Sequence, residues 1–297
     1  MGKLFSFLTL MRPANVVTAL ADIAAGLAIS GFLTADDPIS DWKKALFLFL
    51  STIGLYGGGV VLNDVFDAPL DAVERPERPI PSGKVSLKEG ATLGAGLLIL
   101  GIIFAALAGF PSFWIALATA IFVIIYDKWA KHSKILGPLT MGICRGLNLL
   151  LGMSLLIHDL SAMMWSICLI PVFFIAAITL TSQGEVHGSN RRSIGFALTI
   201  DSIIFLVLVV LAHFNYDFLW YSLPFVAFWY VLNLRAKSKA IRNNIPQNIK
   251  MAVKTGVLSL IPLNAAYTAI FGTWYYGIAV LCLLPVSLWL AKKFAVT

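Results

Sequence analysis

Charged side chains are scarce in this sequence of 297 residues. Asp, Glu, Lys and Arg make up 12% of it, where soluble domains have about 25%, and 59% of the residues are hydrophobic. This composition, with a mean hydropathy of +0.86, excludes an ordinary soluble domain and predicts a protein that crosses a membrane several times. Cysteine is also scarce. The three cysteines lie in apolar runs without metal-ligand spacing, so we expect them to be buried as small hydrophobic residues.

No low-complexity segment or long linker divides the chain, so we expect a single integral-membrane domain over residues 1–297. A membrane-spanning helix needs roughly 20 apolar residues. Apolar runs of about this length predict an all-α, polytopic transmembrane helix bundle with nine to ten helices. The candidate spans are residues 13–33, 43–66, 89–109, 112–128, 136–157, 162–183, 194–213, 217–235, 252–271 and 274–291.

Basic residues are distributed unevenly over the connections between these spans. With the N-terminus in the cytoplasm, nearly all of them fall on the cytoplasmic side, and only Lys43 and Lys44 fall on the other. We therefore expect a multi-pass protein of the cell's inner or plasma membrane with a cytoplasmic N-terminus. The net charge of +7 then reflects topology, and we expect no nucleic-acid partner. The longer connections also lie on the cytoplasmic side, which predicts an active site there.

Four polar residues end the second apolar run, in the stretch NDVFDAPLD from Asn63 to Asp71. On a helix, Asn63, Asp64, Asp67 and Asp71 project from about one face. Carboxylates that converge in this way are typical of a Mg²⁺ site. Because Pro69 interrupts a helix, we expect the helix to end near Asp67 and Asp71 to reach back from a loop. The alternative is a solvated helix end, where Asn and Asp are common.

Basic residues close to this stretch are suited to binding phosphate. Arg75 and Arg78 follow it directly, and Lys131 lies in a later connection on the same predicted side. Lys128 and Arg191 could serve the same purpose, or could only reflect the positive charge of the cytoplasmic side. A divalent cation and a phosphate at a membrane surface indicate chemistry on a lipid pyrophosphate.

Polar residues inside the predicted spans are further candidates for function. Arg145 and Asn148 are three residues apart on one predicted helix, where both could face a cavity. Asn15 on the first span could join them, and Asp22 is one possible charge partner for Arg145. The alternative is an internal structural pair that fixes how the helices pack.

The motif NDxxDxxxD at residues 63–71, followed by RPxRPIPSG at 75–83, resembles the first signature of the UbiA superfamily of intramembrane prenyltransferases. Residues 12–15 resemble the family's RPxN, residues 126–131 its Tyr-to-Lys element, and residues 145–148 also fit. The resemblance covers at least residues 12–195. It implies an all-α bundle around a central cavity that opens laterally to lipid. It also implies two acidic motifs, after helices 2 and 6, that hold Mg²⁺ and a prenyl pyrophosphate.

The second motif departs from the family pattern, which has two or more aspartates. The sequence here is TSQGEVHGSNRR at residues 181–192. Glu185 stands where one aspartate is expected, and Ser182 replaces another. Either Glu185 completes a weakened site, or two-metal activation has been lost. His187 could contact metal or substrate, or could be an ordinary interfacial histidine. This variant resembles a branch of the superfamily found with the Ebo proteins (the EboC-like branch).

The favoured function is Mg²⁺-dependent transfer of a prenyl group from a prenyl pyrophosphate to a small acceptor, which could be an aromatic ring, a phenol or an alcohol. The altered second motif keeps open a non-catalytic lipid-binding or carrier protein on the same scaffold. An ion-coupled transporter fits less well, because the acidic residues gather at one membrane face. The candidate catalytic residues are Asn63, Asp64, Asp67, Asp71 and Glu185, the last four of them metal ligands, and the candidate substrate-binding residues are Asn15, Arg75, Arg78, Lys131, Arg145 and Asn148.

Overall fold

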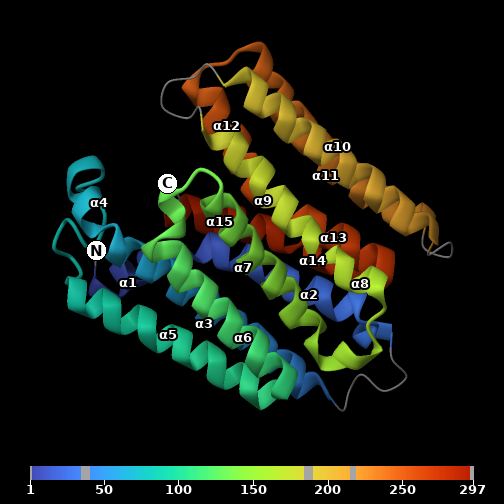
Figure 1. Ribbon diagram of the computed structural model, residues 1–297, viewed down its shortest axis with the longest axis horizontal. Helices are drawn as coiled ribbons and strands as arrows, with labels where there is room; N and C mark the ends of the chain where they lie inside the picture. Colours follow the sequence, from blue (N-terminus) through green and yellow to red (C-terminus); the bar gives the residue numbers. More distant parts are fainter. Residues whose placement is uncertain (1, 35–40, 184–189, 215–218, 295–297) are drawn as a thin grey trace.

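The computed structural model describes residues 2–34, 41–183, 190–214 and 219–294 (Figure 1). These residues form an all-α bundle without strands, as the apolar runs predict. The longer helices are α1 (Lys3–Met11), α2 (Pro13–Ile29), α3 (Trp42–Phe66), α5 (Leu87–Ala108), α6 (Phe110–Lys128), α7 (Leu136–Met153), α9 (Leu169–Ser182), α10 (Arg191–Phe214), α11 (Leu219–Arg242), α12 (Pro246–Leu258), α13 (Leu260–Phe271) and α15 (Leu283–Lys293). The shorter ones are α4 (Ala68–Glu74), α8 (Ala162–Ile167), α14 (Trp274–Leu281), η1 (Phe32–Thr34), η3 (Ala130–His132) and η4 (Ser154–Asp159).

Among the described residues, seven helical segments are long and apolar enough to cross a membrane, and the pair α1–α2, bent by 45°, could form an eighth. All ten predicted spans correspond to a helix or a helix pair. Two predicted spans are not among the segments that are long and apolar enough to cross a membrane. One is α11, which carries several Lys and Arg residues in its last turns, and the other is the pair α12–α13, which breaks at Ser259. The predicted count of nine to ten is therefore roughly consistent with the bundle.

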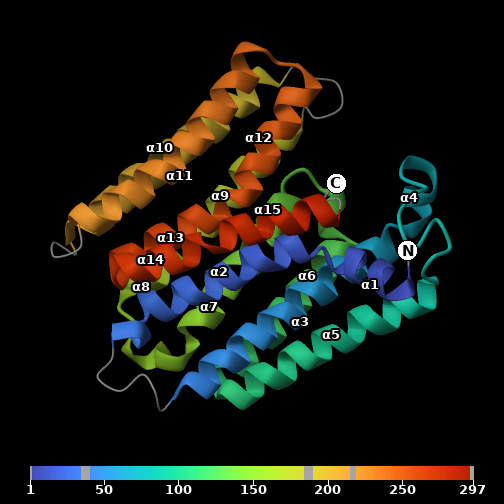
Figure 2. The same ribbon diagram turned by 180° about the vertical axis from the view of Figure 1, so that it is seen from behind.

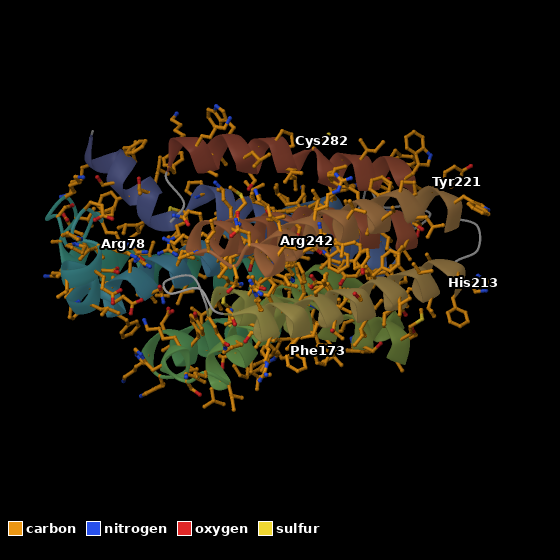
Figure 3. The ribbon with its side chains drawn as sticks, turned by 90° about the horizontal axis from the view of Figure 1, so that it is seen from above. Arg78, Phe173, His213, Tyr221, Arg242 and Cys282 are labelled. Carbon is orange, nitrogen blue, oxygen red and sulfur yellow. The ribbon has the colours of Figure 1, made fainter. Side chains whose placement is uncertain are left out.

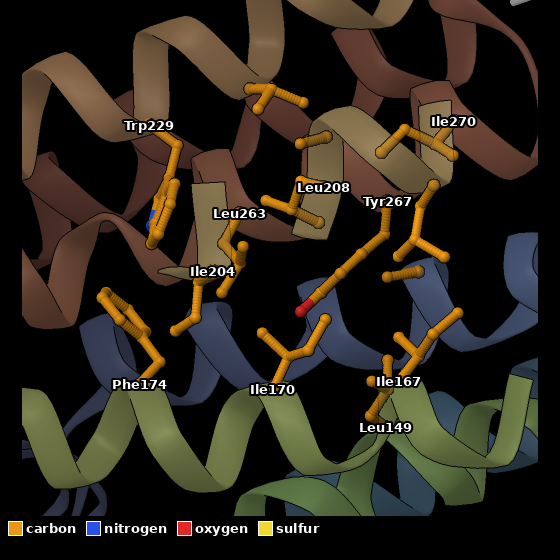
Figure 4. Close-up of a cluster of buried hydrophobic side chains, with 14 of the residues drawn as sticks. Leu149, Ile167, Ile170, Phe174, Ile204, Leu208, Trp229, Leu263, Tyr267 and Ile270 are labelled. Carbon is orange, nitrogen blue, oxygen red and sulfur yellow. The ribbon is translucent and has the colours of Figure 1, made fainter. Parts of the chain in front are cut away.

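Helix α2 lies between the two halves of the bundle (Figure 2). One half packs α3, α5 and α6 around side chains such as Leu48, Leu55 and Ala116. The other packs α9, α10, α11 and α13 around Phe174, Trp229 and neighbouring aliphatic residues (Figure 4). Helices α2 and α7 contribute to both cores. A helix that is buried along most of its length in this way holds the halves in one arrangement.

The hairpin of α10 and α11 is linked by buried polar side chains. Lys237 Nζ lies 2.5 Å from Asp201 Oδ2, with both residues at most 1% exposed. Ser202 and Tyr230 form a further hydrogen bond of 2.9 Å between the two helices. Polar contacts of this kind join helices in lipid, where apolar side chains gain nothing by leaving the hydrocarbon.

Helices α3 and α5 approach closely because glycines face each other. An added Cβ at Gly54 would lie 2.6 Å from the Leu97 carbonyl oxygen, whereas one at Gly96 would meet nothing within 4 Å. We expect Gly54→Ala to lower stability by about 1–3 kcal/mol, because backbone must move to make room. The matched variant Gly96→Ala should be neutral or slightly stabilising. Thermal unfolding of both variants in detergent checks this, and equal melting temperatures would contradict the close packing.

One end of the bundle collects both termini, α4, the connection from α6 to α7 and that from α11 to α12 (Figure 1). Viewed from above, Arg78 lies toward this end, and His213 and Tyr221 lie at the other (Figure 3). The stacking of Phe5 on Phe294, with ring centroids 5.0 Å apart, brings the first helix to the last. The connections assigned to one membrane side by their charge therefore meet at one end of the fold.

Candidate active site

The acidic stretch spans the junction of α3 and α4. Helix α3 ends at Phe66, and Asp67 caps both helices. The prediction of a helix end near Asp67 is confirmed, but the prediction that Asp71 lies in a loop is wrong. Pro69 occupies the first turn of α4, where its missing N–H costs no helical hydrogen bond, so the proline starts a new helix that carries Asp71.

Three carboxylates and three basic side chains meet here, and we call Asp64, Asp67, Asp71, Arg12, Arg78 and Lys131 the charged cluster. Arg78 Nη1 lies 2.6 Å from Asp71 Oδ2 and 3.4 Å from Asp64 Oδ1. Arg12 Nη2 lies 2.6 Å from Asp64 Oδ1, and Lys131 Nζ lies 2.6 Å from Asp67 Oδ1. Asp64 and Asp71 are 5% and 3% exposed, so both need these partners.

The cluster includes two of the three basic residues predicted to bind pyrophosphate. Arg78 and Lys131 belong to it, but Arg75 at the C-cap of α4 is exposed and lies outside it. Arg12 was missed as a site residue, although the RPxN stretch contains it. Its backbone, at φ +48°, adopts the left-handed conformation that L-residues seldom use, between α1 and α2. Such strain is typical of functional sites, and here the bend lies where Arg12 reaches Asp64.

Asp127 is the second residue that the sequence analysis missed. It lies in the last turn of α6 and is 2% exposed, and its Oδ1 accepts a hydrogen bond of 2.9 Å from Asn63 Nδ2. The available signal was an acidic residue at the end of an apolar run, the same signal that identified Asp64. Asn63 thus connects the first motif to the Tyr126–Lys131 element.

A cavity of about 220 Å³ opens beside the charged cluster, between α2, α3, α6 and α7. Asn15, Asn63, Arg145 and Asn148 all line it, so these four predicted site residues are brought together. Its apolar lining comes from Leu55, Val60, Val123, Met141, Ile175, Val257 and Leu260. A cavity with a charged rim and apolar walls is suited to a ligand with an anionic head and a hydrocarbon tail.

Arg145 and Asn148 are held from behind by Asp22, as the sequence suggested for Arg145. Arg145 Nε lies 2.7 Å from Asp22 Oδ2, and Asn148 Nδ2 donates to the same oxygen at 2.9 Å. Asn264 donates to Asp22 Oδ1 at 2.6 Å, and Arg145 also donates to the Thr18 carbonyl oxygen at 2.5 Å. The two residues therefore line the cavity and also join α2, α7 and α13.

Part of the second motif, including Glu185 and His187, lies outside the described residues. On one side of that gap, the Ser182 hydroxyl donates to the Thr179 carbonyl oxygen of its own helix at 2.8 Å. On the other side, Asn190 Nδ2 donates to the carbonyl oxygens of Leu180 and Thr181 at the end of α9. Ser182, which stands at an expected aspartate position, thus uses its hydroxyl in a hydrogen bond within its own helix.

The first motif offers the ligand chemistry that Mg²⁺ prefers. Asp64, Asp67 and Asp71 are hard oxygen donors, two of them buried, and they fit this ion chemically. Each of them faces a basic side chain, and no three acidic, His or Cys side chains of the described ranges are close enough to share a metal. Binding the ion would therefore require the basic side chains to turn toward another anion.

Comparison with known proteins identifies the family. Residues 24–251 match the model of the UbiA prenyltransferase family. A digeranylgeranylglyceryl phosphate synthase of Metallosphaera sedula is 35% identical over 184 residues, which are 60% of this chain and 60% of that protein. One of Saccharolobus solfataricus is 37% identical over 154 residues, 50% of this chain and 51% of that protein. The chain thus spans little more than half the length of these curated relatives.

The fold agrees with solved structures. A UbiA homologue of Archaeoglobus fulgidus, bound to GPP and Mg²⁺, superposes with a TM-score of 0.62 at 16% identity, over 93% of this chain and 99% of that one. A chain from a structural study of digeranylgeranylglyceryl phosphate synthase gives a TM-score of 0.68 at 24% identity, over 93% and 100% of the two chains. At these identities the likeness concerns the fold, and the match to the family model settles membership. The chain is an integral membrane protein of the UbiA prenyltransferase family.

Proposed function

We propose that this protein transfers a prenyl group from a prenyl pyrophosphate to an acceptor inside the membrane. The observation that carries this proposal is that the charged cluster reaches, through Arg12, a cavity whose walls are largely apolar. The basic members suit the pyrophosphate, and the apolar walls suit the prenyl chain. We assign this function to residues 1–297 as one domain.

The basic side chains stabilise the negative charge that develops on the leaving group. Arg12, Arg78 and Lys131 pair with the three carboxylates. When Mg²⁺ binds those carboxylates, the basic side chains are free to turn toward the pyrophosphate and stabilise its charge. Arg75 is exposed next to this cluster and is proposed to meet the outer phosphate on entry. Mg²⁺ held by Asp64, Asp67 and Asp71, with Glu185 from the second motif, would neutralise pyrophosphate charge when bound.

The cavity positions the reacting carbon and keeps water away from it. Asn15, Arg145 and Asn148 line the cavity, and the last two are fixed by contacts with α2. The apolar side chains along the walls hold the prenyl chain in line with the acceptor. Positioning of two bound reactants of this kind can account for much of a rate enhancement.

The acceptor is proposed to be an alcohol. Among the three acceptor classes open from sequence, an alcohol agrees with the relatives named digeranylgeranylglyceryl phosphate synthase, whose product is a glyceryl phosphate that carries two geranylgeranyl groups. The bundle end with the charged cluster is proposed to face the cytoplasm, together with the N-terminus. The excess of Lys and Arg in the connections at that end supports this orientation.

A non-catalytic lipid-binding protein is the second candidate. The observation in its favour is that Ser182, at an expected aspartate position, bonds to its own helix. The two functions differ in turnover. A lipid-binding protein would retain prenyl pyrophosphate without releasing pyrophosphate.

The deciding experiment incubates purified protein in detergent with geranylgeranyl pyrophosphate and a glyceryl phosphate that carries one geranylgeranyl group, with and without Mg²⁺. We expect pyrophosphate release that requires both Mg²⁺ and the acceptor. Binding of the prenyl pyrophosphate without any release would support the lipid-binding function instead. The absence of both binding and release would contradict both candidate functions.

A further inference from the structure

One oxygen of Asp127 is buried and has no partner. Its Oδ1 accepts the hydrogen bond from Asn63, but Oδ2 is shielded from solvent and meets no donor. Buried carboxylate oxygens almost always have a donor, because an unpaired one costs free energy. An unsatisfied oxygen of this kind, in a residue that is 2% exposed, indicates a missing partner.

The nearby basic side chains are occupied elsewhere. Lys131, one turn further along the chain, pairs with Asp67 at 2.6 Å. Lys128, the next residue in α6, lies over the ring of Trp129 at 4.5 Å. Neither of these two cations forms an ion pair or a hydrogen bond with Oδ2.

Asp127 is one of the residues that line the cavity, and its Oδ2 is itself shielded from solvent. Asp127 lines the cavity together with Asn63, Tyr126 and Cys144, on the helix that faces the acidic motif. Asn63 Nδ2 fixes the carboxylate through Oδ1, which leaves the other oxygen as the reactive position. A ligand in the cavity that carries a hydroxyl group would supply the missing donor.

We propose that Asp127 is the residue that binds the acceptor's hydroxyl group and takes its proton. This assignment rests on the proposed prenyl transfer and names the acceptor as a compound with an O–H nucleophile. Asp127 Oδ2 first accepts a hydrogen bond from that hydroxyl. The bond between prenyl C1 and the pyrophosphate oxygen breaks, and its electron pair leaves with pyrophosphate. A lone pair of the acceptor oxygen forms the new bond to C1, and the hydroxyl proton passes to Oδ2.

This role explains why the carboxylate stands apart from the charged cluster. A base in direct contact with Arg or Lys would be weakened by that cation, and Asp127 is held instead by the neutral amide of Asn63. Asn63 then has a positioning role, since it orients Asp127 through a hydrogen bond and leaves the proton acceptor free. General bases that are placed in this way typically contribute about 10²–10⁴-fold to the rate.

Three proteins test the assignment: Asp127→Asn, Asp127→Ala and the matched control Asp159→Asn, whose side chain is exposed at the other end of the bundle. The readouts are binding of geranylgeranyl pyrophosphate with Mg²⁺ and transfer to the glyceryl phosphate that carries one geranylgeranyl group. We expect Asp127→Asn to bind the donor within about threefold of the wild type but to transfer at least about 100-fold more slowly. Donor binding also shows that the variant is folded.

Chemical rescue separates a base from a structural residue. Added formate should restore part of the transfer by Asp127→Ala, because a small carboxylate can enter the space left by the side chain, and should not affect Asp159→Asn. Wild-type transfer rates in either Asp127 variant would overturn the assignment and leave the proposed function intact. So would a variant that binds donor but does not respond to formate. No transfer by the wild-type protein would contradict the proposed function itself, and this assignment with it.

Discussion

Asp67→Asn should abolish pyrophosphate release, with a loss of at least about 100-fold. Asp67 is the most exposed carboxylate of the charged cluster, with 21% of its side chain accessible, and it orients Lys131 at 2.6 Å. Asparagine keeps the size and removes the charge, so Lys131 loses its partner and Mg²⁺ loses a ligand. Because Asp67 lies between two helices and reaches solvent, the fold should tolerate the change. A coupled assay of released pyrophosphate measures the effect.

The matched control is Glu74→Gln, an exposed carboxylate on α4. Glu74→Gln should release pyrophosphate within about twofold of the wild-type rate, since an exposed charge outside the cluster contributes little to the site. Both variants should elute and melt like the wild type in detergent. Release that persists in Asp67→Asn at the control rate would remove Asp67 from the site.

Asp22→Ala should cause the largest loss of stability, about 3–5 kcal/mol. Asp22 is 1% exposed and accepts from Arg145, Asn148 and Asn264, so its removal leaves a buried guanidinium and two buried amides without their acceptor. The measurement is the midpoint of thermal unfolding in detergent, detected as the loss of the protein's fluorescence peak in size-exclusion chromatography.

A double variant separates the charge effect from lost packing. Asp22→Leu combined with Arg145→Met removes both charges, and should recover much of the stability lost in Asp22→Ala while transfer stays low, because Arg145 also lines the cavity. An Asp22→Ala protein that melts within 1 °C of the wild type would contradict a structural role for this network.

The sequence predicted those parts of the fold and site that depend on local composition. Apolar runs marked the helices, and Pro69 marked the end of α3 near Asp67, because both are properties of neighbouring residues. The pairing of Asp22 with Arg145 was foreseeable for another reason. Two opposite charges inside predicted spans are costly unless they meet.

The sequence could not show which of several similar residues lie in the site. Arg75 and Arg78 lie three residues apart in the same signature, but the turn after α4 brings only Arg78 to Asp64 and Asp71. Arg12 and Asp127 lie in stretches that were recognised, yet their inward orientation depends on the bend between α1 and α2 and on the rotation of α6 against α3. These are tertiary features that one sequence does not encode in a readable pattern.

The Asp22 network implies that α2 enters the membrane before it can assemble with the helices that hold Asp22. Helix α2 is made before its partners, since Asn148 and Asn264 follow Asp22 by 126 and 242 residues. Until they arrive, α2 carries an acidic residue without its partners, which costs about 2.5–3.5 kcal/mol at the centre of an inserting helix. Insertion of the nascent helix is therefore only marginally favourable. It needs help from the insertion machinery or protonation of Asp22. Arg145 and Asn148 arrive with α7 and Asn264 arrives with α13, so later helices supply in two steps the polar partners of a helix made before them.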